Sequence, residues 1–354
     1  MLSFMRKKIF LLLCLFFVGW ANLANSELIP EDEQMDIISK YSLIVPQTNT
    51  NAAFCPYSFK KMQDLLANQA SPDQSAPLPD LSIDGIVSHN VFLSNKPIND
   101  KIKKMSDTSV YHDLEPATLQ KANEEIYRLT NNLIEGKLQW DFDTTGFLAA
   151  NVTYLKNKWL IQFEDVKNGM DFYHHDGSAK KVPAFRAINI SKMKVVSTSG
   201  YTVYVIPCKN KNQQMLIIEP YEGSRETPNT FLDSKGKWLD IIETARANAK
   251  PLDDAYDDMD FITFTMPEFT IKQQHNLTSH LPIPGEYGQA NQDIFIKVDK
   301  NGVEAAAVTN VVSADSCASR EKHIKINRAF AFLFTDNSTT LPLFMGAVYD
   351  PTEK

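Results

Sequence analysis

The sequence predicts an α+β fold with large, mostly antiparallel sheets. Helical periodicity is concentrated between residues 58 and 138, whereas from Gly146 onward the apolar residues come in short runs separated by polar turns. Helices in the first part of a chain and strands in the rest are typical of α+β architecture. A hydrophobic content of 43% is enough for a substantial core.

Two helices are expected in the first part. Residues 58–68 carry Phe59, Met62, Leu65 and Leu66 on one face. A second helix is expected at 117–138, where the following residues share a face: Ala122, Ile126, Leu129, Leu133 and Ile134. The segment 69–84 between them is rich in proline, serine and aspartate and is expected to be a loop.

Strands are expected in the remainder of the chain. Two hairpins stand out, one from 201–206 and 215–218 around a polar turn, the other from 329–334 and 341–348. Single strands are expected at 147–155, 261–266 and 294–298.

The first 26 residues have the pattern of a signal peptide. A basic start at 6–8 is followed by an unbroken apolar run at 9–20 and by small residues before Glu27. We therefore expect residues 27–354 to form a single secreted domain, extracellular or periplasmic. No later stretch is long and apolar enough to hold the protein in a membrane.

Charge and cysteine usage exclude several classes of partner and cross-link. The net charge of −7 becomes −10 without the three basic residues of the leader, which disfavours nucleic acid as a partner. Cys14 leaves with the leader, so the odd set Cys55, Cys208 and Cys317 remains, and we expect no disulfide. We expect a monomer without a cofactor. We also expect no metal, because neither His174–His175 nor the aspartates at 253–260 have the spacing of a metal site.

The segment after Val298 has the most unusual composition. A turn at 299–302 is followed up to Val312 by small, uncharged residues, and Glu304 is the only charge among them. Exposed loops are usually richer in Gly, Pro, Asn and Asp. Alanine, valine and threonine can instead enter a sheet, and strand alternation would leave Glu304 outside while Val303 and Ala305 face inward.

This segment resembles the hinge of the serpin family, in which Gly-Thr-Glu-Ala-Ala-Ala-x-Thr is typical. The hinge residues are Gly302, Val303, Glu304, Ala305, Ala306, Ala307, Val308 and Thr309, with Val303 in place of the usual threonine. Further blocks similar to serpin segments follow in one order along the chain: 51–59, 151–163, 204–207, 215–220, 266–269, 330–334 and 343–351. The sequence is therefore identified as a divergent and somewhat shortened member of this family.

The resemblance implies a fold, a site and an activity. The implied fold has three β-sheets with a large central sheet, about nine helices, some of them shortened, and an exposed reactive-centre loop at about 300–324. The implied activity is inhibition of serine proteases, or of cysteine proteases, by a suicide substrate. The loop is cleaved and its hinge inserts into the central sheet. Such a protein supplies no catalytic group and is not an enzyme.

Two positions are candidates for the cleaved bond. Counting from the hinge as the family usually runs gives Ser316–Cys317, which suits proteases with pockets for small residues. Arg320–Glu321 is the obvious site for a trypsin-like protease, but it requires a longer inserted segment. We favour the window around Ser316.

Two further site features follow from the resemblance. A buried polar cluster beneath the central sheet is expected from Ser58, Asn151 and Gln292, the last standing where a histidine often occurs. Gln292 is expected to hydrogen-bond Asn151. At the loop entry, Lys300 and Glu268 exchange the signs usual in the family, which predicts an ion pair between them.

Two other functions are weighed against inhibition. A non-inhibitory serpin used for binding or as a scaffold is the main alternative, and the discriminating feature is the hinge, which here lacks proline and bulky charge. A hydrolase is disfavoured, since histidines and acids do not cluster around a nucleophile motif.

Overall fold

The computed structural model describes most of the chain after residue 47. The described residues are 36–37, 40–41, 43–45, 48–70, 85–135, 138–139, 146–188, 190–224, 226–232, 237–281, 288–303, 320–337 and 341–353. The expected signal peptide and much of the expected reactive-centre loop lie outside them.

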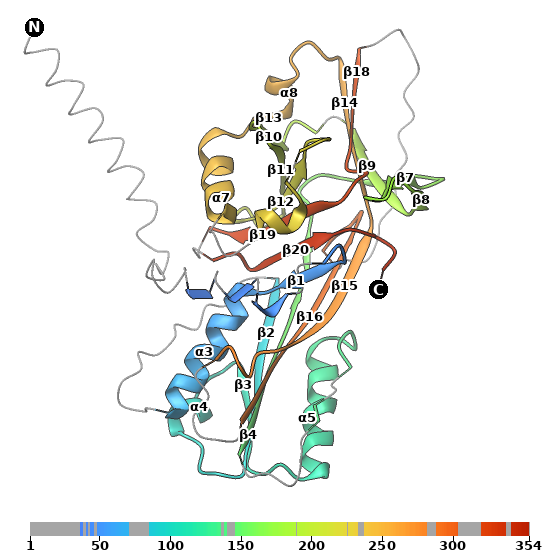
Figure 1. Ribbon diagram of the computed structural model, residues 1–354. Coiled ribbons are helices and arrows are strands. Elements are labelled where there is room, and N and C mark those ends of the chain that lie inside the picture. The colour runs from blue at the N-terminus through green and yellow to red at the C-terminus, as the bar shows by residue number, and fades with distance from the viewer. Residues whose placement is uncertain are drawn as a thin grey trace, which may run out of the picture.

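Three sheets form the body of the molecule, as expected, and an extra hairpin makes a fourth (Figure 1). Sheet I contains β3 (Thr108–Tyr111), β2 (Ile86–Ser94), β4 (Phe147–Leu155), β16 (Gly288–Asp299), β17 (Gly302–Val303), β5 (Asn157–Lys158) and β15 (Phe269–Asn276). Sheet II contains β1 (Ala52–Phe54), β20 (Phe344–Val348), β19 (Phe330–Asp336), β12 (Gln213–Pro220), β11 (Tyr201–Pro207), β10 (Lys194–Ser197) and β13 (Lys250–Pro251). Sheet III contains β18 (Glu321–Lys325), β14 (Phe261–Pro267), β9 (Ala184–Ile188) and β6 (Glu164–Asp165), and the hairpin pairs β7 (Met170–Tyr173) with β8 (Ala179–Val182).

The α+β class and both predicted hairpins are confirmed. The first hairpin is β11 with β12 and the second is β19 with β20, each antiparallel and both in sheet II. Most ladders are antiparallel; the pairs β2–β3, β4–β16 and β14–β18 are parallel. The described residues form six named helices, α3 (Pro56–Ala70), α4 (Asp100–Lys103), α5 (Pro116–Leu129), α6 (Pro228–Phe231), α7 (Lys237–Asn248) and α8 (Leu252–Ala255).

The helix expected at 117–138 ends earlier than its apolar pattern suggested. Asn131 and Asn132 adopt left-handed backbone angles, with φ of 50° and 67°. Asparagine tolerates this conformation better than most residues, and it terminates a helix. The chain therefore leaves the helix after Leu129, although Ile134 still reaches the same apolar cluster.

Sheet I is covered on both faces. Helix α3 packs on its inner face, in a cluster that includes Phe92, Phe147 and Ala149. Helix α5 packs on its outer face, in a cluster that includes Leu148 and Ala150. The two helices lie on opposite sides of the strands in Figure 1. Alternation along β4 thus sends odd-numbered side chains inward and even-numbered ones toward α5.

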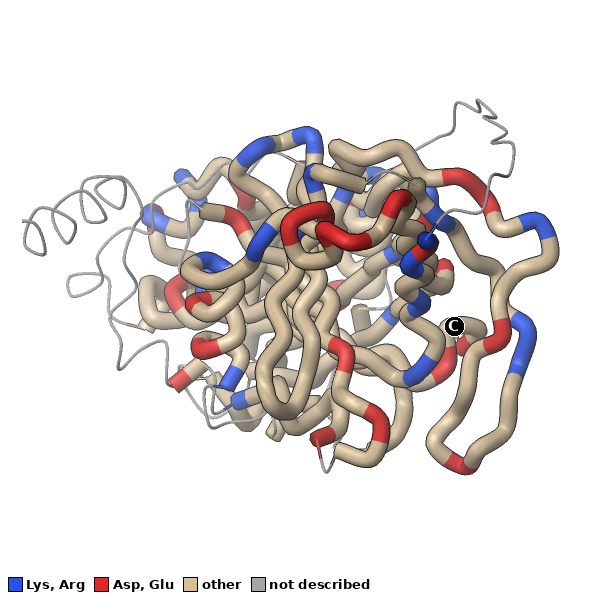
Figure 2. The backbone as a smooth tube through the Cα atoms, turned by 90° about the horizontal axis from the view of Figure 1, so that it is seen from above, with Lys and Arg blue, Asp and Glu red and all other residues tan. Residues whose placement is uncertain are grey.

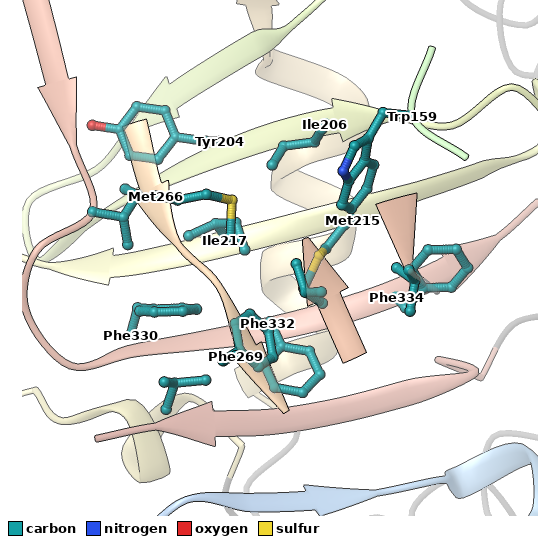
Figure 3. Packing of buried hydrophobic residues seen from close by; sticks show 14 of the residues in the cluster. Trp159, Tyr204, Ile206, Met215, Ile217, Met266, Phe269, Phe330, Phe332 and Phe334 are labelled. Atoms are coloured by element: carbon teal, nitrogen blue, oxygen red, sulfur yellow. The ribbon is translucent and has the colours of Figure 1, made fainter. Parts of the chain in front are cut away.

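Sheets II and III share the largest apolar cluster. Figure 3 shows Trp159 beside Ile206 and Met215 at one end of it and Tyr204 at the other. This cluster extends beneath the upper part of sheet I. No helix of the described residues is long and apolar enough to cross a membrane.

Candidate loop-insertion site

The centre of sheet I is a parallel ladder between two long strands. β4 and β16 pair from Phe147↔Gly288 to Tyr154↔Phe295, with no strand between them. On its other side β16 pairs with β15 along most of its length. Beyond Tyr154 and Phe295 the two central strands separate.

The short strand β17 occupies the place where they separate. Val303 pairs antiparallel with Val298 of β16, and Gly302 with Asp299. On the other side Val303 pairs with Asn157 of β5, the continuation of β4. The first two residues of the hinge therefore lie between the two central strands at the upper end of the sheet.

Gly302 is required by this close approach. Its φ is +145°, and a Cβ atom built on it would lie 1.9 Å from the carbonyl oxygen of Asn157. No side chain fits at that distance, so only glycine lets β17 pair with both neighbours. The structure thus gives a physical reason for the glycine that starts the hinge motif.

Val303 enters the apolar core beneath the sheet. It is 1% exposed and belongs to the cluster that contains Val298 and Trp159. The Trp159 indole N–H donates to the carbonyl oxygen of Asp299 at 2.8 Å, which fixes the end of β16. The valine that replaces the usual threonine is therefore accommodated as an apolar residue.

The prediction that Lys300 forms an ion pair with Glu268 is wrong, because Lys300 pairs with a different carboxylate. The Lys300 ammonium group binds a carboxylate oxygen of Asp165 on β6. Among the ion pairs of the described residues, none joins Lys300 to Glu268. Asp165 is the more exposed carboxylate, so its charge costs less desolvation than a charge on the half-buried Glu268.

Glu268 instead lies among other acids. Burial raises the pKa of the Glu268 carboxyl, and the negative charges of Asp299 and Asp165 raise it further, while Lys297 and Lys300 lower it. Lys300 thus acts on Glu268 through space without pairing with it. The loop entry carries a mixed network of charges rather than one ion pair.

The buried polar cluster exists, but its hydrogen bonds differ from the expected ones. Ser58, Asn151 and Gln292 are all fully buried, as expected. The Gln292 amide N–H donates to Ser58 Oγ at 2.6 Å and to the Cys55 carbonyl oxygen at 3.1 Å. Gln292 and Asn151 are neighbours in the ladder, yet no described hydrogen bond joins their side chains.

Asn151 turns to the neighbouring strand β2. Its Nδ2 donates to Asn90 Oδ1 at 2.8 Å and to Ser88 Oγ at 3.2 Å, and its Oδ1 accepts from Thr153 at 2.5 Å. The expected Gln292–Asn151 hydrogen bond is therefore corrected, because β2 offers Asn151 nearer partners. Gln292 Oε1 stays buried without a hydrogen-bond partner among the described residues.

The cysteines of the described residues are free thiols. Cys55 and Cys208 are both buried and unpaired, which fits the expected absence of a disulfide between them. Burial raises the pKa of the Cys55 thiol to about 11 and that of Cys208 to about 12. Both are thus inert protonated thiols at neutral pH.

The far end of the expected loop is anchored to sheet III. The Arg320 backbone N–H donates to Asp260 Oδ2 at 2.9 Å, and its carbonyl oxygen accepts from the Asp260 N–H at 2.8 Å. Glu321 then begins β18 and pairs in parallel with Phe261 of β14. Acidic residues gather around this anchor on α8 and the turn that leads to β14, at the end nearest the viewer in Figure 2.

The described residues contain no cluster that could hold a metal ion.

The remaining predicted site residues lie outside the described part of the chain. These are the hinge residues Glu304, Ala305, Ala306, Ala307, Val308 and Thr309 and the candidate scissile residues Ser316 and Cys317. Arg320 and Glu321, the alternative scissile pair, are described.

A polar network that holds α5 on sheet I was not anticipated. Glu125 of α5 accepts hydrogen bonds from Ser109 Oγ at 2.8 Å and from the Tyr111 hydroxyl at 2.5 Å, both on β3. Ser109 Oγ also lies 2.8 Å from His89 Nε2 on β2. The only signal in the sequence was a glutamate beside the apolar face of the helix. Asn131, just after the helix, donates to the Tyr154 hydroxyl at 2.6 Å and ties the same region to β4.

Comparison with known proteins identifies the family. A family model described as serpin (serine protease inhibitor) matches residues 60–287 and 284–351. The chain belongs to the serpin family. The family model describes inhibitors of proteases and not enzymes.

The relatives of this serpin are distant. It is 24% identical over 294 residues to neuroserpin of Homo sapiens, covering 74% of this chain and 69% of the relative. Serpin-Z2 of Arabidopsis thaliana is 26% identical over 241 residues, covering 64% of this chain and 56% of the relative. Thyroxine-binding globulin of Pan troglodytes is 24% identical over 287 residues, covering 73% of this chain and 65% of the relative. The chain spans little more than half the length of some of these relatives.

Solved structures share the fold over nearly the whole chain. The thermophilic serpin tengpin in its native state gives a TM-score of 0.68 at 18% identity, covering 92% of this chain and 96% of tengpin. A thyroxine-binding globulin complex with thyroxine gives a TM-score of 0.69 at 17% identity, covering 92% of this chain and 100% of that protein. At these identities the likeness shows the fold alone.

Proposed function

We propose that this serpin is a secreted, monomeric inhibitor of serine proteases that acts as a suicide substrate. The protease cleaves the reactive-centre loop, and the hinge then inserts between β4 and β16. The observation that carries the proposal is the position of β17, which already pairs with both strands that would flank an inserted segment. The hinge is thus poised at the upper end of its own insertion path.

The two ladders of β17 converge on one register. Counted along β16, three residues beyond Val303 brings Ala306 opposite Phe295. On the other side, Val303 is opposite Asn157 of β5. Counting three residues back from Asn157 into β4, while counting three forward from Val303, brings Ala306 opposite Tyr154. Phe295 and Tyr154 already face each other in the parallel ladder. A strand extended from β17 therefore fits both neighbours without a register shift.

Insertion exchanges one parallel ladder for two antiparallel ladders. Parallel pairing is slightly less stable per residue than antiparallel pairing. The inserted strand also satisfies its own backbone groups in the sheet and buries its apolar side chains. The uninserted state then persists because of a kinetic barrier, which cleavage of the loop removes.

The small hinge residues fit both faces of this slot. In the continued register, Ala305 and Ala307 face the inner core, and Ala306 and Val308 face the cluster under α5. Alanine and valine enter such surroundings without leaving a buried polar group unsatisfied. The composition of the hinge therefore suits rapid insertion.

The chemical step belongs to the protease. Its nucleophilic oxygen attacks the carbonyl carbon of the scissile residue, the peptide C–N bond breaks, and the leaving amine takes up a proton. The product is an ester between the protease and the new C-terminus of the loop. Water would hydrolyse this ester, so inhibition requires that insertion displace the protease first.

The register favours the bond Ser316–Cys317. Pairing from Gly302 reaches the lower end of β16, at Gly288, with residue 313. A segment that ends at Ser316 therefore fills the slot with a short overhang. Cleavage at Arg320–Glu321 would leave a longer tail, and Arg320 is hydrogen-bonded to Asp260 through its backbone, which a protease would have to displace. We therefore expect target proteases that accept small residues.

A binding or scaffold role is the second candidate. It is favoured by the similarity to thyroxine-binding globulin, a relative named for a small ligand. A serpin of that kind would be cut in its loop without trapping the protease.

One experiment separates the two candidates. The purified protein is incubated with elastase, subtilisin and trypsin, and the products are analysed on denaturing gels and by mass spectrometry of the released C-terminal peptide. A covalent complex with elastase or subtilisin and a peptide that begins at Cys317 are expected. Clean cleavage without a complex, by all three proteases, contradicts inhibition.

A further inference from the structure

We infer that Lys156 and Lys297 form a receiving pair for the carboxylate of Glu304 as the hinge enters sheet I. This inference rests on the proposed insertion of the loop. It assigns to two exposed lysines a role in guiding the first steps of insertion.

The two lysines lie opposite each other across the slot. Continuing the parallel ladder by two residues beyond Tyr154↔Phe295 brings Lys156 opposite Lys297. Both side chains are exposed and, by alternation, lie on the same outer face as Tyr154 and Phe295. With one strand between them, their backbones would be about 10 Å apart, since neighbouring strands lie about 4.8 Å apart.

Glu304 is the residue that falls between them. It follows Val303, whose partners are Val298 and Asn157, so the next position in both antiparallel ladders is opposite Lys297 and Lys156. Since Val303 is buried in the core, strand alternation would turn the Glu304 side chain outward in an inserted strand. Glu304 is also the only charged residue between Gly302 and Ser313.

The surroundings on the β4 side are basic. Lys156 takes part in none of the ion pairs of the described residues, and it lines a hollow together with Lys158 and Lys209 and no acidic residue. On the β16 side, Lys297 pairs with Asp299 of its own strand at 3.5 Å and also acts on the nearby Glu268 carboxyl, so acidic groups partly offset its charge. A carboxylate that enters between the two ammonium groups therefore meets attraction from both sides.

The expected benefit is kinetic, because Glu304 is among the first residues to enter. An exposed ion pair contributes little to overall stability. However, acylated protease is lost to hydrolysis at a fixed rate, so a modest change in the insertion rate alters the fraction of protease that is trapped. Charge at this position thus shifts the balance between inhibition and cleavage.

A charge-reversal experiment tests the inference. The double variant Lys156→Glu/Lys297→Glu is compared with the unmodified protein in the ratio of covalent complex to cleaved inhibitor, using elastase or subtilisin at low salt. We expect this ratio to fall by about three- to tenfold, and the fall to shrink at about 1 M salt, where exposed charges are screened. Adding Glu304→Lys to the double variant is expected to restore the ratio, because the signs are then exchanged together.

Lys272→Glu is the matched control. Lys272 is exposed on β15 and pairs with Phe295, two residues from Lys297 along β16, so it faces the same side as Lys297, but β16 separates it from the slot. It is expected to leave the ratio unchanged. An unchanged ratio in the double variant, or no restoration by Glu304→Lys, overturns the inference and leaves the inhibitory function standing. Absence of any covalent complex with the unmodified protein instead overturns the proposed function.

Discussion

Tyr154 on β4 and Phe295 on β16 face each other as the last pair of the parallel ladder at the centre of sheet I. Both side chains are buried in the cluster beneath α5. Directly above them the strands separate and admit β17. In the proposed insertion, this pair marks the point that the advancing hinge would pass, and Ala306 would lie between the two side chains.

Ala306→Arg is expected to abolish the covalent complex while leaving cleavage of the loop intact. In the continued register an arginine at this position would be buried between Tyr154 and Phe295, under α5. Burial of an unpaired guanidinium group costs several kcal/mol, which corresponds to a fall of about 100-fold or more in trapped protease. The products are quantified on denaturing gels after incubation with elastase or subtilisin.

Ala306→Val is the control for that variant, since it adds volume without charge and should retain most of the complex. An arginine variant that forms as much complex as the unmodified protein would contradict the insertion register.

Thr309→Val is expected to weaken the cleaved, inserted form and to leave the uncleaved form unchanged. The same register places Thr309 between Asn151 and Gln292, on the inner face. Its hydroxyl would reach Gln292 Oε1, which is buried without a partner among the described residues. Loss of this hydrogen bond should cost about 1 kcal/mol of stability.

The measurement is the free energy of unfolding of cleaved and of uncleaved protein, each by denaturant titration. Thr309→Ser keeps the hydroxyl and should behave like the unmodified protein. Equal destabilisation of the cleaved and uncleaved forms by Thr309→Val would place Thr309 elsewhere.

Lys300 and Asp165 are expected to show a larger coupling energy in the stability of the protein than Lys300 and Glu268. A double-mutant cycle with Lys300→Met and Asp165→Asn should give a coupling energy of about 0.2–1 kcal/mol, the range of exposed ion pairs. The matched cycle with Glu268→Gln in place of Asp165→Asn should give less, because Lys300 reaches Glu268 only through space. Both are measured by denaturant titration at low salt, and a larger coupling with Glu268 would reverse the assignment.

Local patterns in the sequence predicted both hairpins, the strands β4 and β14 and part of β16, whereas the family resemblance predicted the burial of the polar cluster. These features depend on alternation and on short blocks that keep their order along the chain. The choice of partner among charged side chains was not predictable in the same way. Asp165 meets Lys300 although 135 positions separate them, and no periodicity distinguishes it from Glu268.

The hydrogen bonds of Asn151 were missed for a related reason. The family resemblance predicts that Gln292 lies beside Asn151, and this adjacency is correct. Which neighbour an amide binds depends on the other strand as well. Without the ladder, Asn90 of β2 could not be placed opposite Asn151, nor Ser88 two residues further along β2. A pattern thus gives burial and register more readily than it gives hydrogen-bond partners.

Glu219→Gln is expected to stabilise the protein at pH 8 and to have little effect at pH 4. Burial raises the pKa of the Glu219 carboxyl from its ordinary 4.5 to about 7, although the Tyr204 hydroxyl and Arg328 favour the charged form. The folded state therefore binds more protons than the unfolded state between these two values, so Glu219 lowers the free energy of unfolding as the pH rises through about 7. Glutamine stays neutral and still accepts from Tyr204, so the gain at pH 8 should be on the order of 2 kcal/mol. The buried His275 works in the opposite direction, because burial lowers its pKa and its contribution is lost as the pH falls. Denaturant titrations at pH 4 and pH 8 check the prediction, and an equal effect of Glu219→Gln at both values would show that the carboxyl does not titrate as its burial requires.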